Sequence, residues 1–385
     1  MNRRSFVTGL SSVRSLVMVN GGFPLIERKS ALERRMRAQI ELGVSHGLTA
    51  GAVMMVVQGD KVLALVAAGY SNLETKKPLC RDAIFDIRSI CKPITVFGAL
   101  LLVDDGKFRL DDPLAKFLPE FSRVRIQGQT EPTEFPITIR QMRHTSGIAA
   151  QRPPELENIT RTFDHTLAQT VALVAHQPLD FTPGSKWTYS SSGIAVLGRV
   201  VEVVSGERYE AFMEQRIFKP LKMRDSSFFT NRAKVDRIPT MYTVESGHLA
   251  KDVIDVTRPG QKYPGPEFGL LSTAEDLRHF CQMMLNRGSW EGRRILSPKL
   301  VAEMIRPQMP TSLPKYYSGL GWAVHPKEAA EMSYAVTDGS YGANGASGGI
   351  VWIDPSLELI RIYLTHHFSG DFTDADPVMT VAFPT

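Results

Sequence analysis

The chain has 385 residues, of which 43% are hydrophobic and 9% aromatic, so it can bury the core of one large domain or two ordinary ones. This composition excludes a disordered or fibrous chain. The formal charge of +5 comes from 45 basic and 40 acidic residues scattered along the sequence, so we do not expect nucleic acid as a partner. No apolar run approaches the ~20 residues that span a bilayer, and no integral membrane segment is expected.

The composition does not favour disulfide or metal chemistry either. Three cysteines, Cys80, Cys91 and Cys281, are few and unevenly spaced, and there is no Cys-x-x-Cys or histidine-rich ligand set. His366 and His367 adjoin on a predicted strand, where neighbouring side chains point to opposite faces, so they are not expected to share a metal. We therefore expect neither a metal nor an organic cofactor.

The first 25 residues have some features of a leader. Arg3 and Arg4, followed by a mildly apolar stretch over 7–19, resemble a twin-arginine export signal, but Arg14 interrupts the stretch and no Ala-x-Ala cleavage site follows. Such a signal would make the protein periplasmic or exported; the alternative is a disordered tail on a cytoplasmic protein. Residues 26–385 contain no internal repeat and no low-complexity linker, which predicts a single domain after the leader.

The remaining elements follow an α+β order. A first helix has an apolar stripe of Leu32, Met36 and Ile40, and two strands then surround a tight turn at Gly59. A second strand pair near the C-terminus surrounds Asp354 to Ser356. Strands at both ends, with helices between them, predict an antiparallel sheet that is built from both termini and flanked by helices, with a mainly helical middle region. The predicted strands are 53–57, 62–66, 350–353 and 359–364, the middle helices 167–175, 194–204, 209–217 and 273–285, and the surface loops 127–136 and 252–267.

Ser89 and Lys92 form a Ser-x-x-Lys pair at the start of another predicted helix. Residues three apart on a helix share a face, so the amine could take the proton of the hydroxyl, which is a poor nucleophile alone. A second match, Ser312 to Lys315, lies between prolines and cannot be helical. The first match is followed by apolar residues at helical spacing and by Gly106 as a stop. From this feature alone, a nucleophile and an ordinary buried helix start both stay open.

An ordered series of motifs from about Gly47 to the C-terminus resembles the serine β-lactamase and penicillin-binding-protein superfamily, in particular its class C and family VIII esterase branch. The resemblance implies a β-lactamase/transpeptidase-like α+β fold over residues 26–385 as the catalytic domain. Each motif is weak alone, whereas the series is specific. The motifs are 85–95, 104–107, 110–113, 118–119, 137–147, 183–190, 217–223, 269–277 and 352–355.

The resemblance also implies roles for particular residues. Ser89 would be the acylated nucleophile, Lys92 the proton acceptor, and Tyr189 the other member of the general-base system. A tyrosine with a pKa near ~10 is a poor base, so this role requires the charge of Lys92 beside the phenolate. The N–H groups of Ser89 and Ala346 would form the oxyanion hole, worth ~3 kcal/mol per donor in other hydrolases. Without the flanking motif, Tyr189 would be an aromatic loop residue.

Two departures from the family pattern concern substrate binding. Ser191 stands where the second motif usually has asparagine, and a hydroxyl makes fewer hydrogen bonds than an amide. Ala343 stands where the third motif carries lysine or histidine, so attraction for a substrate carboxylate is lost and penicillins should be poor substrates. Gly345 still allows close backbone approach, and Asn344 is either a polar contact or a turn residue.

Two further serine arrangements compete with this interpretation. Gly345 to Gly349 matches the Gly-x-Ser-x-Gly nucleophile elbow around Ser347, but that motif must open a helix and a strand is predicted here. His144 could suggest a Ser–His pair, but we expect a hydrogen-bonded loop histidine. The sequence therefore predicts a serine hydrolase that acts through an acyl-enzyme on a small-molecule ester, amide or β-lactam. The alternative is an inactive descendant of the fold that serves as a binding or scaffold protein; the oligomeric state is not predicted.

Overall fold

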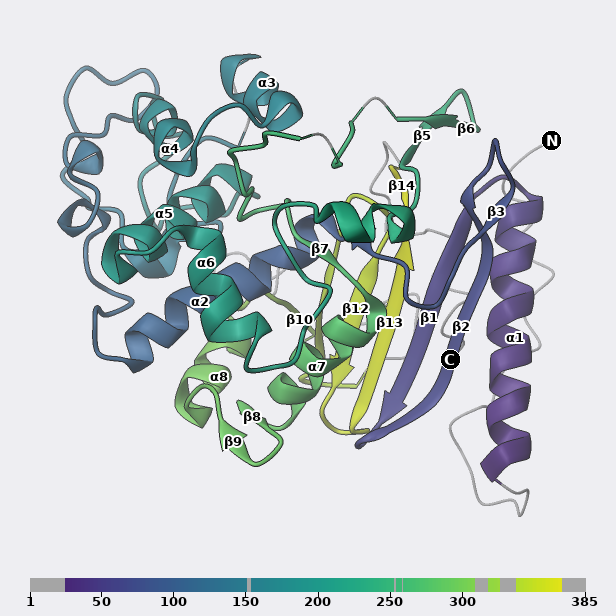
Figure 1. Cartoon of the computed structure of the whole chain (residues 1–385). Helices are drawn as coiled ribbons and strands as arrows, with labels where there is room; N and C mark the ends of the chain where they lie inside the picture. Colours follow the sequence, from purple (N-terminus) through teal and green to yellow (C-terminus); the bar gives the residue numbers. More distant parts are fainter. Residues whose placement is uncertain are drawn as a thin grey trace.

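A seven-stranded antiparallel sheet is the centre of the computed structural model (Figure 1), which describes residues 25–150, 154–252, 254–257, 259–308, 318–325 and 337–368. Its strand order is β10-β11-β12-β13-β1-β2-β3. The strands are β1 (Gly51–Gln58), β2 (Lys61–Asn72), β3 (Lys77–Pro78), β10 (Ala323–Val324), β11 (Tyr341–Asn344), β12 (Ile350–Asp354) and β13 (Leu359–Thr365). The N-terminal β1 pairs directly with the C-terminal β13, which confirms a sheet built from both ends of the chain.

Helices cover both faces of the sheet. They are α1 (Leu25–Ser45), α2 (Cys91–Asp104), α3 (Pro154–Thr162), α4 (Leu167–Ala175), α5 (Ser191–Ser205), α6 (Tyr209–Met213), α7 (Ala274–Leu285) and α8 (Pro298–Ile305). In Figure 1, α1 lies along the outer side of β1 and β2, whereas α2, α7 and the helical middle region lie on the other side. The predicted middle helices are confirmed, and the one expected over 209–217 is α6 continued by a π-helical turn, Glu214–Phe218.

Alternation along β1 directs its side chains into two cores. Met54 packs with Met36 and Ile40 of α1, so the predicted apolar stripe of that helix is confirmed. Val53 and Met55 point to the opposite face and join the main core. That core contains α2, whose residues Cys91 to Leu102 are all buried. A helix that is apolar all round belongs in the middle of a protein, and here it fixes the position of the residues that start it.

Short strand pairs complete the fold. Strand β4 (Phe85–Asp86) pairs with β7 (Leu271–Ser272) just before α2 begins. The other pairs are β5 (Tyr242–Glu245) with β6 (His248–Lys251), β5 with β14 (His367–Phe368), and β8 (Ser289–Trp290) with β9 (Arg293–Arg294).

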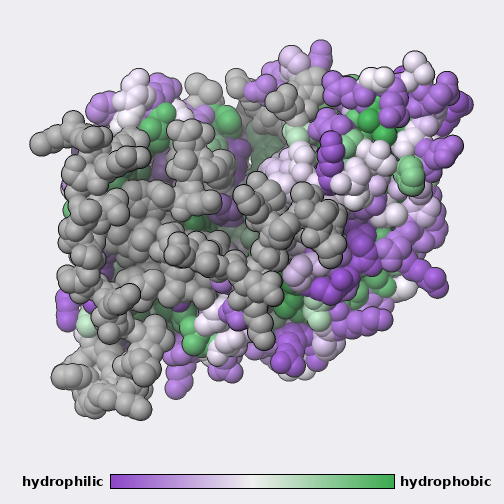
Figure 2. Space-filling view, turned by 180° about the vertical axis from the view of Figure 1, so that it is seen from behind, coloured by the Kyte–Doolittle hydropathy of each residue, from purple (hydrophilic) through white to green (hydrophobic). Residues whose placement is uncertain are grey.

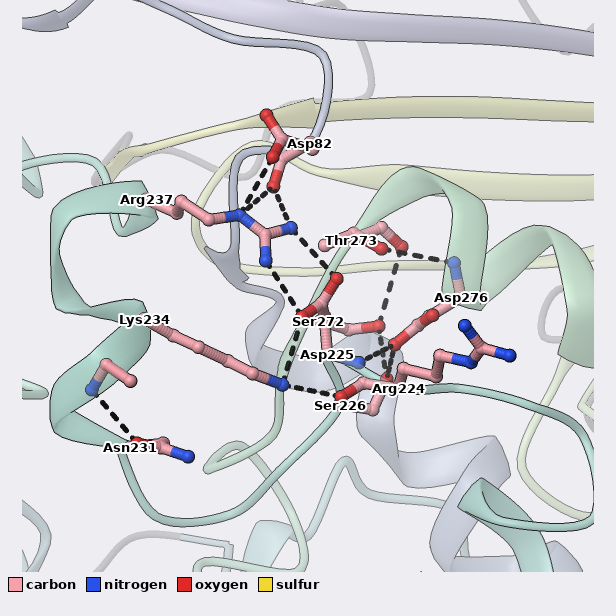
Figure 3. Close-up of polar contacts among 11 residues, drawn as sticks. Asp82, Arg224, Asp225, Ser226, Asn231, Lys234, Arg237, Ser272, Thr273 and Asp276 are labelled. Carbon is pink, nitrogen blue, oxygen red and sulfur yellow. Dashed lines mark hydrogen bonds and ion pairs between the residues drawn. The ribbon is translucent and has the colours of Figure 1, made fainter.

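A polar cluster anchors β7 and the start of α7 (Figure 3). The Arg237 guanidinium donates two hydrogen bonds to the Asp225 carboxylate, at 2.9 and 2.8 Å. The Asp225 N–H and the Ser226 hydroxyl both donate to the Asp276 carboxylate at 2.8 Å, and Ser226 also bonds Ser272 at 2.9 Å. The cluster therefore holds the strand that supports β4, and through β4 the segment leading to Ser89.

Of the two predicted surface loops, one is confirmed and the other is partly wrong. Residues 127–136 are mostly exposed, as expected, whereas 263–267 at the end of the second loop are buried against α2. This segment can be buried because side chains of α2 make hydrogen bonds to its backbone. The Pro266 carbonyl accepts hydrogen bonds from Thr95 (2.5 Å) and Cys91 (3.2 Å).

Some predictions fall on residues that the structure does not describe. The expected leader, residues 1–25, lies outside the described residues apart from Leu25 in α1, and so does the second Ser-x-x-Lys match at 312–315. Within the described residues, no helix is long and apolar enough to cross a bilayer. From behind, the coloured part of the surface is mainly hydrophilic with small hydrophobic areas between (Figure 2).

Candidate active site

Ser89 lies in a short 3-10 turn, Arg88–Ile90, between β4 and α2, so the α-helix begins two residues after the serine. Arg88 has a left-handed backbone conformation, with φ +48°, which costs a non-glycine residue about 1–2 kcal/mol. Its side chain is buried, with Nε 2.8 Å from the Asp86 carboxylate and the guanidinium over the Phe268 and Phe368 rings. These contacts hold the strained residue, and with it the orientation of the serine that follows.

The Lys92 side chain returns from α2 to the serine. Its Nζ donates to Ser89 Oγ at 2.6 Å and to the backbone carbonyl of Glu267 at 2.7 Å, and the residue is 3% exposed. Both acceptors are uncharged. The structure thus brings together the two residues that the sequence pairs by spacing, and adds a carbonyl from the 263–267 segment that fixes the amine.

Tyr189 reaches the same oxygen from the loop before α5. Its hydroxyl lies 2.8 Å from Ser89 Oγ, and Lys92 Nζ lies 5.0 Å from its ring centroid. Burial opposes ionisation of the phenol, but the Lys92 charge, hydrogen bonds from Lys92 and Ser89, and the Arg143 charge outweigh it and lower the Tyr189 pKa. The tyrosine is 45% exposed, so a substrate can reach it.

His144 supports this tyrosine. The two rings stack with centroids 4.7 Å apart, and His144 Nδ1 accepts the Ser190 N–H at 3.1 Å. Burial, with the Arg143 and Lys92 charges, lowers the His144 pKa well below its usual value, so the ring is neutral. The prediction of a hydrogen-bonded loop histidine is confirmed, while its stacking under Tyr189 was not foreseen.

The third motif lies beside the serine turn. A Cβ added to Gly345 would stand 2.3 Å from the Ile87 carbonyl oxygen, so only glycine permits this approach. The turn after β11 is closed by hydrogen bonds that Gly345 and Gly348 donate, and neither uses the Ala346 N–H. Ala343 is half-buried on β11, and Asn344 is exposed.

The second motif opens a helix. Ser191 is the first residue of α5 and half-buried, and the preceding Ser190 caps the helix by accepting the Gly193 N–H at 3.1 Å. This cap fixes the chain direction just after Tyr189.

The expected strand after Ser347 is confirmed, so the match to a nucleophile elbow is coincidental. Ser347 is buried, and β12 follows it where an elbow would require a helix. His366 and His367 are also buried, and each bonds elsewhere: His366 Nδ1 to the Thr240 carbonyl at 2.7 Å, His367 Nδ1 to Thr365 Oγ1 at 3.2 Å. In the part of the chain that the structure describes, no three His, Cys, Asp or Glu side chains are grouped so that they could hold a metal.

Sequence reasoning missed two neighbours of the site. Glu267 supplies the carbonyl that holds Lys92, and its carboxylate accepts the Tyr263 hydroxyl at 2.8 Å. Arg143 affects Tyr189 through its charge. The position of this arginine directly before His144, in a motif that the resemblance includes, is a signal that could have drawn attention to it; the sequence around Glu267 offers none.

A lysine and a tyrosine converge on one serine oxygen, as the Ser-x-x-Lys and second motifs predicted. The chain belongs to the β-lactamase family: the family model Beta-lactamase matches residues 32–382. It is similar to an uncharacterized protein of Mycobacterium tuberculosis (32% identical, covering 88% of this chain and 91% of the relative) and to Esterase EstB of Burkholderia gladioli (30%, 54% and 55%).

A solved structure agrees on the fold. EstCE1, a hydrolase with promiscuous acyltransferase activity, superposes with a TM-score of 0.80 at 24% identity, covering 92% of this chain and 98% of EstCE1. The protein therefore has the β-lactamase/transpeptidase-like α+β fold expected from the sequence. The family match and the named relatives place it in a superfamily of serine hydrolases.

Proposed function

We propose that the protein is a serine hydrolase that cleaves small esters through an acyl-enzyme on Ser89. The observation that carries this proposal is the convergence of Lys92 Nζ (2.6 Å) and the Tyr189 hydroxyl (2.8 Å) on Ser89 Oγ. Two titratable groups within hydrogen-bond reach of one hydroxyl can accept its proton and return it later.

The reaction has two halves. In the first, Ser89 Oγ attacks the ester carbonyl while its proton passes to the Lys92 and Tyr189 pair. The oxyanion is held by the N–H groups of Ser89 and Ala346, and the leaving alcohol takes the proton as the carbon–oxygen bond breaks. In the second, water gives a proton to the same pair, attacks the acyl-enzyme, and releases the acid while Ser89 recovers its proton.

Substrate choice follows from the altered motifs. The Ala343 methyl group, half-buried on β11, offers no charge to the carboxylate that penicillins carry, and Ser191 offers a hydroxyl where an amide would hold an acyl-amide side chain. Esters therefore suit this site better than penicillins or D-amino-acid amides. The similarity to an esterase is consistent with this preference.

An activity panel tests the proposal. Short-chain nitrophenyl esters, D-amino-acid amides and a chromogenic β-lactam are compared on the wild type and on Ser89→Ala. Ester hydrolysis at least tenfold above both other classes, and absent from Ser89→Ala, is the expected result. No hydrolysis of any class would favour the inactive binding or scaffold protein instead.

A further inference from the structure

A cavity of about 300 Å³ lies beside the catalytic group, and the proposed acyl transfer does not use it. Its wall includes His144, Trp187 and Leu320. His144 also stacks on Tyr189, so a single aromatic ring separates this cavity wall from the tyrosine. The cavity is thus next to the group that we assign to proton transfer.

The part of the wall formed by Gly319 and Leu320 connects the cavity to the nucleophile helix and to the edge of the sheet. A Cβ added to Gly321 would stand 2.8 Å from the Pro93 Cα, so the segment after Leu320 rests on the start of α2. The same segment continues into β10, which pairs with β11 at Gly342, one residue before Ala343. The segment that lines the cavity at Gly319 and Leu320 thus leads directly into the strand pair that carries Ala343.

Arg143 brings a positive charge to this cavity. Its NH1 donates to the carbonyls of Gly319 (2.7 Å) and Trp322 (2.6 Å) and to the Ser318 hydroxyl, all of them uncharged acceptors. Its Nε is buried without a hydrogen-bond partner, and no carboxylate of the described residues pairs with the guanidinium. Burial lowers the Arg143 pKa to about 10, which still leaves a cation at neutral pH.

The other polar groups on the wall do not compensate this charge. Arg140 also lines the cavity, but it is paired with Asp111 at 2.6 Å and with Glu303. His144 is neutral, and its buried Nε2 has no partner among the described residues. Apart from Tyr189, whose pKa it helps to lower, the buried Arg143 charge has no anionic partner among the described residues, and an anionic ligand would reduce the cost of burying it.

We propose that this cavity binds a carboxylate on the leaving group of the substrate, with Arg143 as the residue that recognises it. The leaving group is the part concerned because Tyr189, next to the cavity, is the group that returns the proton to it. The inference rests on the proposed ester hydrolysis. Under this proposal the preferred substrates are esters whose alcohol or phenol carries a carboxylate. Arg143 recognises this carboxylate from the tyrosine side of the site, whereas Ala343 offers no cation on the strand side.

Two substrates of matched shape test the proposal: 4-acetoxybenzoate, whose leaving group is an anion, and its neutral analogue 4-acetoxybenzamide. Charge-assisted hydrogen bonds to a guanidinium are about twice as strong as neutral ones, so we expect kcat/KM about tenfold or more higher for the benzoate. Arg143→Gln should abolish the preference. Arg140→Gln, which removes a cation already paired with carboxylates, is the matched control and should keep it.

The outcomes separate this proposal from the one on which it rests. Equal kcat/KM for the two esters in the wild type, or a preference that survives Arg143→Gln, would overturn the subsite while ester hydrolysis stands. No Ser89-dependent hydrolysis of either ester would overturn the proposed function itself. If Arg143→Gln does not fold, inhibition of the wild type decides: 4-hydroxybenzoate should inhibit about tenfold more tightly than 4-hydroxybenzamide, and equal inhibition contradicts the subsite.

Discussion

Replacing Lys92 is the most informative test of the proton-transfer pair formed by Lys92 and Tyr189. Lys92→Met keeps much of the side-chain volume but removes an ammonium that lies 2.6 Å from Ser89 Oγ and 5.0 Å from the Tyr189 ring centroid. The pair that exchanges the serine proton then loses one member, and the tyrosine loses the charge that lowers its pKa. General acid–base catalysis contributes about 10²- to 10⁴-fold to rate, so we expect kcat/KM on a nitrophenyl ester to fall by at least about 10³-fold.

The activities of the single and double variants show whether Ser89 and Lys92 act as one catalytic unit. Ser89→Ala should lose about as much activity as Lys92→Met, and the double variant little more, because members of one unit do not contribute independently. The substitution also removes the hydrogen bond from Lys92 to the buried Glu267 carbonyl, at a cost of about 1–3 kcal/mol in the free energy of unfolding, so thermal unfolding must show that the variant is folded at the assay temperature. A folded Lys92→Met with more than about a tenth of wild-type activity would refute the shared-proton mechanism.

Three further predictions follow from other parts of the structure. Ala343→His should raise kcat/KM on carboxylate-bearing β-lactams relative to neutral esters, and an unchanged ratio would mean that Ala343 does not face the substrate. Gly345→Ala should cost at least about tenfold in ester kcat/KM, because its Cβ would stand 2.3 Å from the Ile87 carbonyl oxygen; wild-type activity would show that β11 does not lie against the serine turn. A hydrogen bond from Arg306 is the main factor that lowers the pKa of Glu303 to about 2, so this carboxylate stabilises the fold above its ordinary pKa of 4.5 and loses that effect as pH falls toward 2. Glu303→Gln should therefore lower the free energy of unfolding by at most about 3 kcal/mol at pH 7 and by less at pH 3.5, and an equal loss at both pH values would contradict this.

Local patterns were enough to predict most of the fold. The hairpin of β1 and β2 follows from two apolar runs around the turn at Gly59, and α4 was predicted with its observed bounds, Leu167–Ala175. The Ser89 and Lys92 spacing gave the centre of the site, because one short turn sets the distance between the two side chains.

Contacts between distant segments could not be predicted in the same way. The 263–267 segment contains prolines and glycine, which are typical of an exposed loop, yet its carbonyls bond side chains of α2 about 175 residues earlier in the chain. Arg143 likewise bonds the Gly319 and Trp322 carbonyls, and neither segment carries a pattern that indicates the other. Hydrophobic periodicity indicates which face of a helix or strand is buried, but not which distant backbone groups will contact that face.

Covalent labelling of the nucleophile tests the central claim most directly. The full-length protein is incubated with an aryl phosphonate ester, which a nucleophilic serine displaces, and the adduct is located by mass spectrometry of its peptides. We expect one phosphonyl group per chain, on Ser89, with no labelling of Ser89→Ala. A folded wild-type protein that stays unlabelled, or that is labelled on another residue such as Ser347, would contradict the account.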